Sequence, residues 1–309
     1  SNFQITTVNC PLLRLYIHFT IAPIAMSASS PLEELSPKVA ALKVKLEAFV
    51  KNHCHPAEDE YEKHLEHLIG QDRWKMKAVP PVIYRLQAEA KRQGLWNVFL
   101  PHRLPEFLPK DLSPSQYLSN REYGILCEIM GRSFLCPEAC NCSAPDTGNM
   151  EVFLKHGTLS QQKLYLRPLL EGKIRSAFLM TEPDVASSDA TNIETLLTKK
   201  IEHVNGQKVT KYILNGRKWW STGAMDPRCK VALVLAKMDY SHVSDEKSDG
   251  DKGAHGAHTV VLVPMEKVEM VRALTVFGYD DAPHGHAEVK LDNIELDESC
   301  LILGEGRGF

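Results

Sequence analysis

The stretch SQQKLYLRPLLEGKIRSAFLM, residues 160–180, contains the change in hydrophobic period that decides the fold. Before Lys173 the apolar residues recur at helical spacing, and this part predicts a helix that begins near Ser160. After Lys173 the period becomes two, and IRSAFLM predicts a strand. We therefore expect an α+β chain with a helical domain over residues 31–172 and a β domain over residues 173–309.

Three further segments before Lys173 predict helices. The segment 37–53 carries one apolar stripe, and the following His53-Cys54-His55-Pro56 is typical of a helix C-terminus. The segment 80–94 starts with proline and ends with glycine. The segment 113–133 begins with Ser113 and Gln116, which match a capping box.

The strands after Lys173 are separated by turns rather than by helices. Asn205-Gly206 and Asn215-Gly216 each predict a hairpin, because both residue types tolerate positive φ. The segments 230–238, 258–265 and 286–296 predict further strands, and the first two are apolar enough to be buried on both faces. The absence of long helices between the predicted strands favours an antiparallel barrel or sandwich over a doubly wound parallel sheet.

Composition excludes several classes of protein. The chain has 309 residues, of which 43% are hydrophobic and 24% charged, as in globular proteins. The net charge of −3 gives no basic excess of the kind that nucleic-acid-binding proteins usually show. Eight cysteines are too few for a disulfide scaffold. We expect no metal site, since the cluster of Cys136, Cys140 and Cys142 lacks further ligands at zinc spacing.

Two segments are set apart from the predicted domains. The apolar run from Pro11 to Met26 is short for a membrane span, so we expect no integral span and interpret residues 1–30 as an uncertain leader or non-domain segment. The segment from Asp239 to His258 is polar and predicts a long, protease-sensitive loop.

Two motifs hold the residues most suited to bind a ligand. AFLMTEPDVASSD, residues 177–189, places hydroxyls and main-chain N–H groups at the end of a strand, although an ordinary Ser- and Asp-rich turn would have the same composition. NGRKWWSTG, residues 215–223, contains two adjacent tryptophans, which strand alternation predicts to lie on opposite faces. One indole would then pack in the core while the other covers a ligand ring or lies on the surface.

These two motifs together resemble the acyl-CoA dehydrogenase family. Met180-Thr181-Glu182-Pro183 is similar to the family's MTEP-type segment, and Trp219-Trp220-Ser221 is similar to its W-x-[S/T] strand. The resemblance covers residues 32–309 and is greatest to the subgroup of family members ten and eleven. One departure is that six residues separate Glu182 from Asp189, where the family commonly has five.

The resemblance implies a fold and a cofactor. The family has a helical N-terminal domain, a middle β domain and a C-terminal four-helix bundle, and the bundle is absent from these 309 residues. FAD is the implied cofactor, with an acyl-CoA thioester against its ring. The bundle is implied to supply both the catalytic base, which would lie beyond Phe309, and much of the binding of the adenine and pyrophosphate of FAD. The chain alone is therefore expected to bind FAD weakly and to have little activity.

The resemblance also implies roles for individual residues. Thr181 would donate hydrogen bonds to the pyrimidine side of the flavin, Trp219 would pack on the ring, and Ser221 would bond near N5. Ser188 would contact the CoA arm, whereas Glu182 would be structural. The full set of implied cofactor-binding residues is Phe178, Met180, Thr181, Ser187, Ser188, Trp219, Trp220 and Ser221.

The implied function is FAD-dependent α,β-dehydrogenation of acyl-CoA thioesters in fatty acid β-oxidation. The implied partners are acyl-CoA, electron-transfer flavoprotein as electron acceptor and further copies of the complete protein, and the implied location is mitochondrial or peroxisomal rather than secreted. Two alternatives are a non-catalytic fragment that binds FAD or acyl-CoA, and a DNA-associated flavoprotein, which the net charge disfavours.

Overall fold

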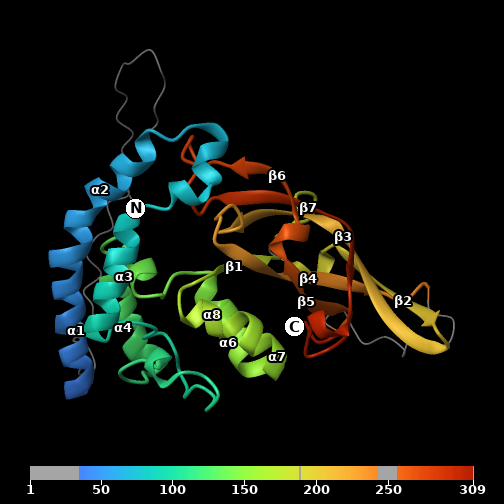
Figure 1. Cartoon of the computed structure of the whole chain (residues 1–309), viewed down its shortest axis with the longest axis horizontal. Coiled ribbons are helices and arrows are strands. Elements are labelled where there is room, and N and C mark those ends of the chain that lie inside the picture. The colour runs from blue at the N-terminus through green and yellow to red at the C-terminus, as the bar shows by residue number, and fades with distance from the viewer. Residues whose placement is uncertain (1–34, 188, 243–255, 309) are drawn as a thin grey trace, which may run out of the picture.

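Helices form one end of the molecule and a curled sheet forms the other (Figure 1). This computed structural model describes residues 35–187, 189–242 and 256–308. The α-helices are α1 (Pro37–Phe49), α2 (His55–Glu66), α3 (Pro81–Gln93), α4 (Asn120–Met130), α5 (Cys136–Ala139), α6 (Asp146–His156), α7 (Leu159–Gln161) and α8 (Arg167–Leu170). The strands are β1 (Arg175–Leu179), β2 (Leu196–Val204), β3 (Gln207–Thr222), β4 (Cys229–Asp239), β5 (His258–Pro264), β6 (Glu269–Leu274), β7 (His286–Leu296) and β8 (Leu301–Ile302).

The first helix does not end at Pro56 as predicted. A π-helical turn, Val50–Cys54, joins α1 to α2, and the main-chain N–H of His55 bonds to the carbonyl of Val50 five residues earlier. A proline in a regular helix clashes with the carbonyl four residues before it. The wider turn changes the spacing of the carbonyls immediately before Pro56, so the helix continues through it.

A π-helical turn also precedes a proline just before the sheet. A second π-helical turn, Gln162–Leu166, lies between α7 and α8 and directly precedes Arg167-Pro168. The predicted helix is therefore present, and its cap is Thr158 with Gln161. The cap predicted at Ser113 is wrong, because α4 begins after Ser119, whose side chain forms a capping box with Glu122.

The strands form one open sheet rather than a closed barrel. Its order is β6-β7-β3-β2-β4-β5-β8, with β1 paired to β4. Most pairs are antiparallel, and the two parallel pairs are β1–β4 and β2–β4. The edge strand β6 was not among the predicted strands, because its first four residues are exposed on both faces and so lack alternation.

Strands β4 and β5 are buried on both faces, as their apolar runs predict. On β4, Val231, Leu233 and Leu235 belong to the core that contains the helices. Ala232 and Val234 belong to a second core inside the curled sheet. The first core therefore extends from the helices onto one face of β4 and β5, while the second lies within the curled sheet.

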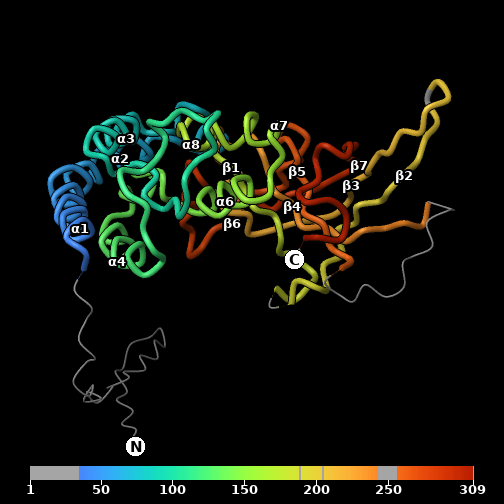
Figure 2. Tube along the Cα trace, turned by 90° about the horizontal axis from the view of Figure 1, so that it is seen from below, coloured from blue at the N-terminus to red at the C-terminus, as the bar shows by residue number. Residues whose placement is uncertain are grey.

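One of the two predicted hairpin turns is present. Asn205 and Gly206, with φ of 52° and 78°, join β2 to β3, and this hairpin projects from the body (Figure 2). The turn predicted at Asn215-Gly216 is wrong, since both residues lie within β3. Gly216 is required there because a Cβ would come within 2.3 Å of the Thr195 hydroxyl.

A buried cluster of charges connects the helices to the sheet. His284 lies between two carboxylates, with Nε2 2.9 Å from Glu138 and Nδ1 2.9 Å from Asp226. Arg228 contacts the same two carboxylates, and Arg175 bonds to Glu138 and to Asp146 on α6. Three acidic and three basic groups thus meet where α5, α6, β1 and two loops converge.

Other predictions concern metals, membranes and the polar loop. Cys136, Cys140 and Cys142 are buried, and the described residues contain no group of His, Cys, Asp or Glu able to hold a metal ion. None of the described helices is both long and apolar enough to cross a membrane. Most of the predicted loop, residues 243–255, lies outside the described residues, whereas His258 begins β5 and is buried.

Candidate functional site

The structure brings the two predicted motifs side by side. The main-chain N–H of Trp219 donates to the carbonyl of Thr181 at 3.0 Å, and the Thr181 hydroxyl donates to the carbonyl of Trp219 at 2.8 Å. Thr181 follows β1 directly, while Trp219 lies near the end of β3. The strand-end loop and the tryptophan strand therefore form one surface, as a shared site requires.

A buried ion pair fixes this junction. The Nζ of Lys218 lies 2.8 Å from the Glu182 carboxylate and 2.8 Å from the carbonyl of Met180, and its side chain is fully buried. Glu182 also accepts bonds from the main-chain N–H groups of Glu194 and Thr195 and from the Thr195 hydroxyl. The loop after β1 is thus tied to β3 and to the start of β2.

These bonds give Glu182 a structural role. Burial raises the pKa of its carboxyl, but the bonds from Lys218 and Thr195 outweigh burial and hold that pKa below its ordinary value. Burial lowers the pKa of Lys218 to about 8, and Glu182 opposes this shift. A carboxylate with both oxygens already bonded is poorly suited to abstract a proton from a substrate.

The two indoles do not lie on opposite faces, contrary to the prediction. Lys218 pairs with Val289 and Ser221 with Ala287, so Trp219 and Trp220 together oppose one residue of β7, Glu288. This β-bulge interrupts the alternation, and Trp220 has a φ of 50°. The two ring centroids are only 6.4 Å apart.

The bulge also decides which side chains of the motif are accessible. Trp220 is 41% exposed and Thr222 is exposed, whereas Ser221 is only 1% exposed. The Ser221 hydroxyl has no hydrogen-bond partner among the described residues. The stretch WWST fits W-x-[S/T] twice, as Trp219-Trp220-Ser221 and as Trp220-Ser221-Thr222. The accessible side chains, Trp220 and Thr222, belong to the second match. This second match was not identified from the sequence.

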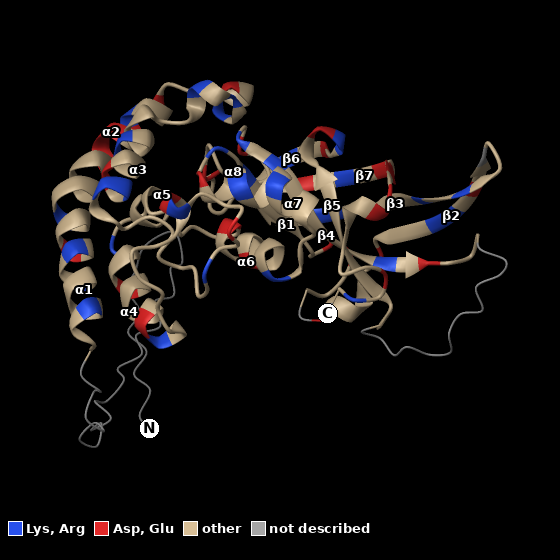
Figure 3. Cartoon of the chain, turned by 60° about the horizontal axis from the view of Figure 1, so that its bottom comes forward, with Lys and Arg blue, Asp and Glu red and all other residues tan. Residues whose placement is uncertain are grey.

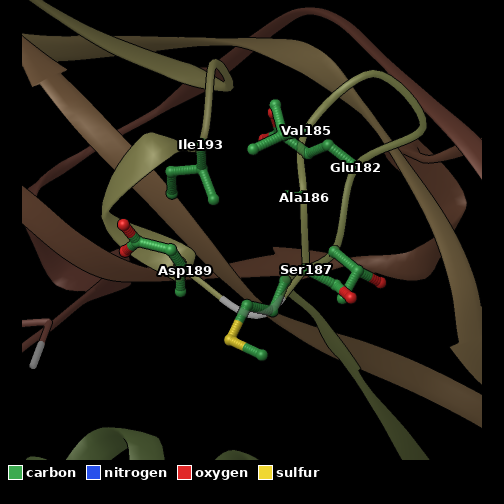
Figure 4. A pocket seen from close by; sticks show the side chains of 9 residues that line it. Glu182, Val185, Ala186, Ser187, Asp189 and Ile193 are labelled. Carbon is green, nitrogen blue, oxygen red and sulfur yellow. The ribbon is translucent and has the colours of Figure 1, made fainter.

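A small pocket lies beside the strand-end loop. Figure 4 shows it between the segment that carries Val185, Ala186 and Ser187 and the turn that carries Asp189 and Ile193. Asp189 caps that turn by accepting a bond from the main-chain N–H of Thr191. The lining residues are Met180, Thr181, Glu182, Val185, Ala186, Ser187, Asp189, Ala190 and Ile193.

The remaining predicted site residues are placed less centrally. Phe178 is half-buried on β1 and packs against the core that contains the helices. Ser187 is exposed at the pocket, and Ser188 lies outside the described residues. The accessible groups near the junction include an indole face and neutral hydroxyls, and the exposed charged residues Asp184, Asp189 and Arg217 belong to the same two motifs. The indole face suits a flat heteroaromatic ring.

Comparison with known sequences gives relatives that are described as acyl-CoA dehydrogenases. The family model for the acyl-CoA dehydrogenase middle domain matches residues 177–294. Acyl-CoA dehydrogenase family member 11 of Gallus gallus is 42% identical over 96% of this chain. Family member 10 of Mus musculus is 40% identical over 90% of it. The chain spans 35% and 24% of the lengths of these two relatives.

Solved structures agree with the sequence comparison. An acyl-CoA dehydrogenase structure from Mycobacterium abscessus matches with a TM-score of 0.73 and 38% identity, covering 89% of this chain and 62% of that one. An acyl-CoA dehydrogenase from Bacillus anthracis complexed with FAD matches with a TM-score of 0.58 and 19% identity, covering 90% and 40%. The second likeness concerns the fold alone.

Proposed function

The chain belongs to the acyl-CoA dehydrogenase family, and from this premise we propose that it binds FAD and takes part in dehydrogenating acyl-CoA thioesters between Cα and Cβ. The observation that carries the proposal is the exposed Trp220 indole beside Thr222, next to Trp219, which is hydrogen-bonded to Thr181 in the loop after β1. When bound, FAD supplies the acceptor for the hydride.

We assign the flavin-facing contacts of this strand to Trp220 and Thr222. Both side chains are accessible, while Ser221 points into the core and Trp219 is half-buried behind the bulge. The alternative assignment, with Trp219 and Ser221 in contact with the ring, would require the end of β3 to change its register. The neutral donors suit FAD because the isoalloxazine ring is uncharged when oxidised.

The loop after β1 is the second proposed contact. Met180, Thr181 and Ser187 line the pocket there. The Thr181 hydroxyl already donates to Trp219, so a bond from Thr181 to the flavin would come from its main-chain N–H. We retain Phe178 as a supporting residue of this loop and Ser188 as the proposed contact to the CoA arm.

The catalytic base is proposed to lie beyond Phe309. Glu182 uses both carboxylate oxygens in bonds to Lys218, Glu194 and Thr195, and Asp189 caps a turn. Neither carboxylate is free to act on a substrate in this arrangement. The residues described here bind and orient the reactants.

The cellular context follows from the family. We propose fatty acid β-oxidation in mitochondria or peroxisomes, with electron-transfer flavoprotein as electron acceptor and a homo-oligomeric complete protein. Basic and acidic residues are interspersed over both the helices and the sheet (Figure 3), which gives little support to a nucleic-acid partner. Organelle fractionation and reduction of purified electron-transfer flavoprotein would test these points.

The site assignment is tested by Trp220→Asn in the natural full-length protein. Asparagine tolerates the positive φ and removes the indole, so the backbone is preserved while the ring surface is lost. We expect the dissociation constant for FAD to rise about 10-fold, as for the loss of one aromatic stacking contact. Lys208→Ala, at the exposed β2–β3 hairpin, is the control. Unchanged FAD affinity in Trp220→Asn would reject the assignment.

A further inference from the structure

His286 touches both groups that we assign to the flavin-facing surface. It pairs with Thr222 across β3 and β7, and its Nδ1 lies 3.0 Å from the Thr222 hydroxyl oxygen. Its ring centroid is 6.0 Å from that of Trp220, at an interplanar angle of 55°. The imidazole side chain is 25% exposed, so it lies partly beneath this surface.

The other ring nitrogen faces a carboxylate. The Nε2 of His286 lies 3.8 Å from the Asp281 carboxylate, which is beyond hydrogen-bond distance. Nδ1 is within hydrogen-bond distance of the Thr222 hydroxyl, and the tautomer of the ring decides which group donates. In either direction the bond occupies one hydrogen-bonding position of the hydroxyl and so restricts how it can turn toward a ligand. The distance of 3.8 Å is too long for the hydrogen bond of a nucleophilic triad.

The backbone around His286 is held on both sides. The N–H of Gly223 donates to the carbonyl of Gly285 at 2.8 Å, and the N–H of Gly285 donates to the carbonyl of Asp281 at 2.9 Å. The loop that carries His286 is therefore fixed to the end of β3. Trp220, in contrast, combines a left-handed backbone with an exposed indole and needs external support to keep one orientation.

We propose that His286 is a positioning residue that fixes the Trp220 indole and the direction of the Thr222 hydroxyl for FAD binding. This inference rests on the proposed function. A binding surface held in its bound conformation loses less entropy when the ligand arrives, so the free protein is prepared for the ring. His286 itself need not touch the flavin.

Two substitutions separate the two contacts of His286. His286→Phe keeps a ring against Trp220 and removes the partner of Thr222, whereas His286→Asn places a polar atom near Nδ1 and removes the ring. We expect each to weaken FAD binding about 3- to 10-fold, since each removes one contact of ordinary strength. Thr222→Val should match His286→Phe, and the double variant should be no weaker than Thr222→Val alone.

A second readout uses the protein without FAD. In His286→Asn, Trp220 loses its ring neighbour, and we expect altered tryptophan fluorescence and near-ultraviolet circular dichroism relative to Trp220→Asn as reference. His286→Phe should retain the wild-type near-ultraviolet signal. Far-ultraviolet circular dichroism of each variant checks that the chain is folded.

The outcomes distinguish this inference from the proposed function. If Trp220→Asn binds FAD normally, the flavin-facing surface itself is assigned wrongly. If Trp220→Asn weakens binding while both His286 variants bind like the wild type, only the role of His286 is overturned. Additive losses in His286→Phe combined with Thr222→Val would also overturn it, because the two residues would then act independently.

Discussion

At the scale of single residues, the site depends on the bulge at Trp219 and Trp220. Lys218 is drawn inward by Glu182, and Ser221 faces the core three residues later. An uninterrupted strand would place positions 218 and 221 on opposite faces. The extra residue lets both face inward, at the cost of a left-handed φ at Trp220 that is worth about 1–3 kcal/mol.

Ser221→Ala tests whether the serine is a core residue. Its hydroxyl is buried and has no partner among the described residues, so removing it should leave the free energy of unfolding unchanged or raise it by about 1 kcal/mol. FAD affinity should also be unchanged, whereas Thr222→Val should weaken it. Urea unfolding and FAD titration measure the two effects. A loss of FAD affinity in Ser221→Ala equal to that in Thr222→Val would restore Ser221 as the flavin contact.

His284 predicts a pH dependence of stability. Burial lowers its pKa, but Glu138 and Asp226 outweigh burial and raise it to about 9, from an ordinary value of 6.5. The folded state therefore holds this proton more tightly than the unfolded state. Its contribution is complete below pH 6.5 and is lost as the pH rises to about 9.

Thermal unfolding between about pH 6 and pH 8 measures this contribution. The pKa of Lys218 is lowered to about 8, so its contribution to the free energy of unfolding rises with pH, but only above about pH 8. The wild type should lose stability across this range, while His284→Gln should be less stable by about 3 kcal/mol at pH 6 and should vary less with pH. His203→Gln on the exposed hairpin is the control. Equal pH dependence in His284→Gln and the wild type would contradict the charged state of His284.

At the scale of elements, the two π-helical turns explain how prolines lie inside helical runs. Each turn ends two residues before a proline, and in each case the N–H of the intervening residue bonds to a carbonyl five residues earlier. The apolar face of α1, with Leu42, Leu46 and Phe49, therefore continues into α2 with a shifted phase. Each π-helical turn adds a residue to the helical run. The regular spacing of the apolar residues does not show where this extra residue lies.

Pro56→Ala tests this explanation. Because the π-helical turn already accommodates the proline, we expect the substitution to change the free energy of unfolding by less than about 1 kcal/mol. Lys45→Pro, at an exposed position inside α1, should cost about 3 kcal/mol or more. Guanidinium denaturation of both variants compares them. A similar large effect from Pro56→Ala would show that the proline itself stabilises the turn.

The sequence predicts element types better than it predicts register. The apolar runs of β4 and β5 and the turn at Asn205-Gly206 depend on local patterns, and all three are confirmed. Asn215-Gly216 carries the same local signal, but the close approach of Thr195 requires a glycine within the strand there. Such requirements come from residues far away in the sequence.

The same limit applies to the candidate site. The two motifs are predictable because their residue types are unusual, and the structure places them together. Which of two adjacent tryptophans is exposed depends on the β-bulge, which lies between the buried side chains of Lys218 and Ser221. His286 has no local signal, because it meets Thr222 only through the pairing of β3 with β7.

At the scale of the whole molecule, the helices and the sheet are joined by a shared apolar core and by the charge cluster around His284. Both junctions involve β1, which carries Arg175 and ends two residues before Thr181. The loop that we assign to FAD is therefore anchored to the helical end on one side and to β3 on the other. This arrangement holds the proposed surface rigid at the junction of the two motifs.

The most direct test of the central claim is amide hydrogen exchange of the natural full-length protein with and without FAD. The account predicts that FAD slows exchange in residues 180–187 and 219–222, where the two motifs meet, and leaves α1 and the tip of the β2–β3 hairpin unchanged. Slowed exchange elsewhere, with none in these two segments, would contradict it.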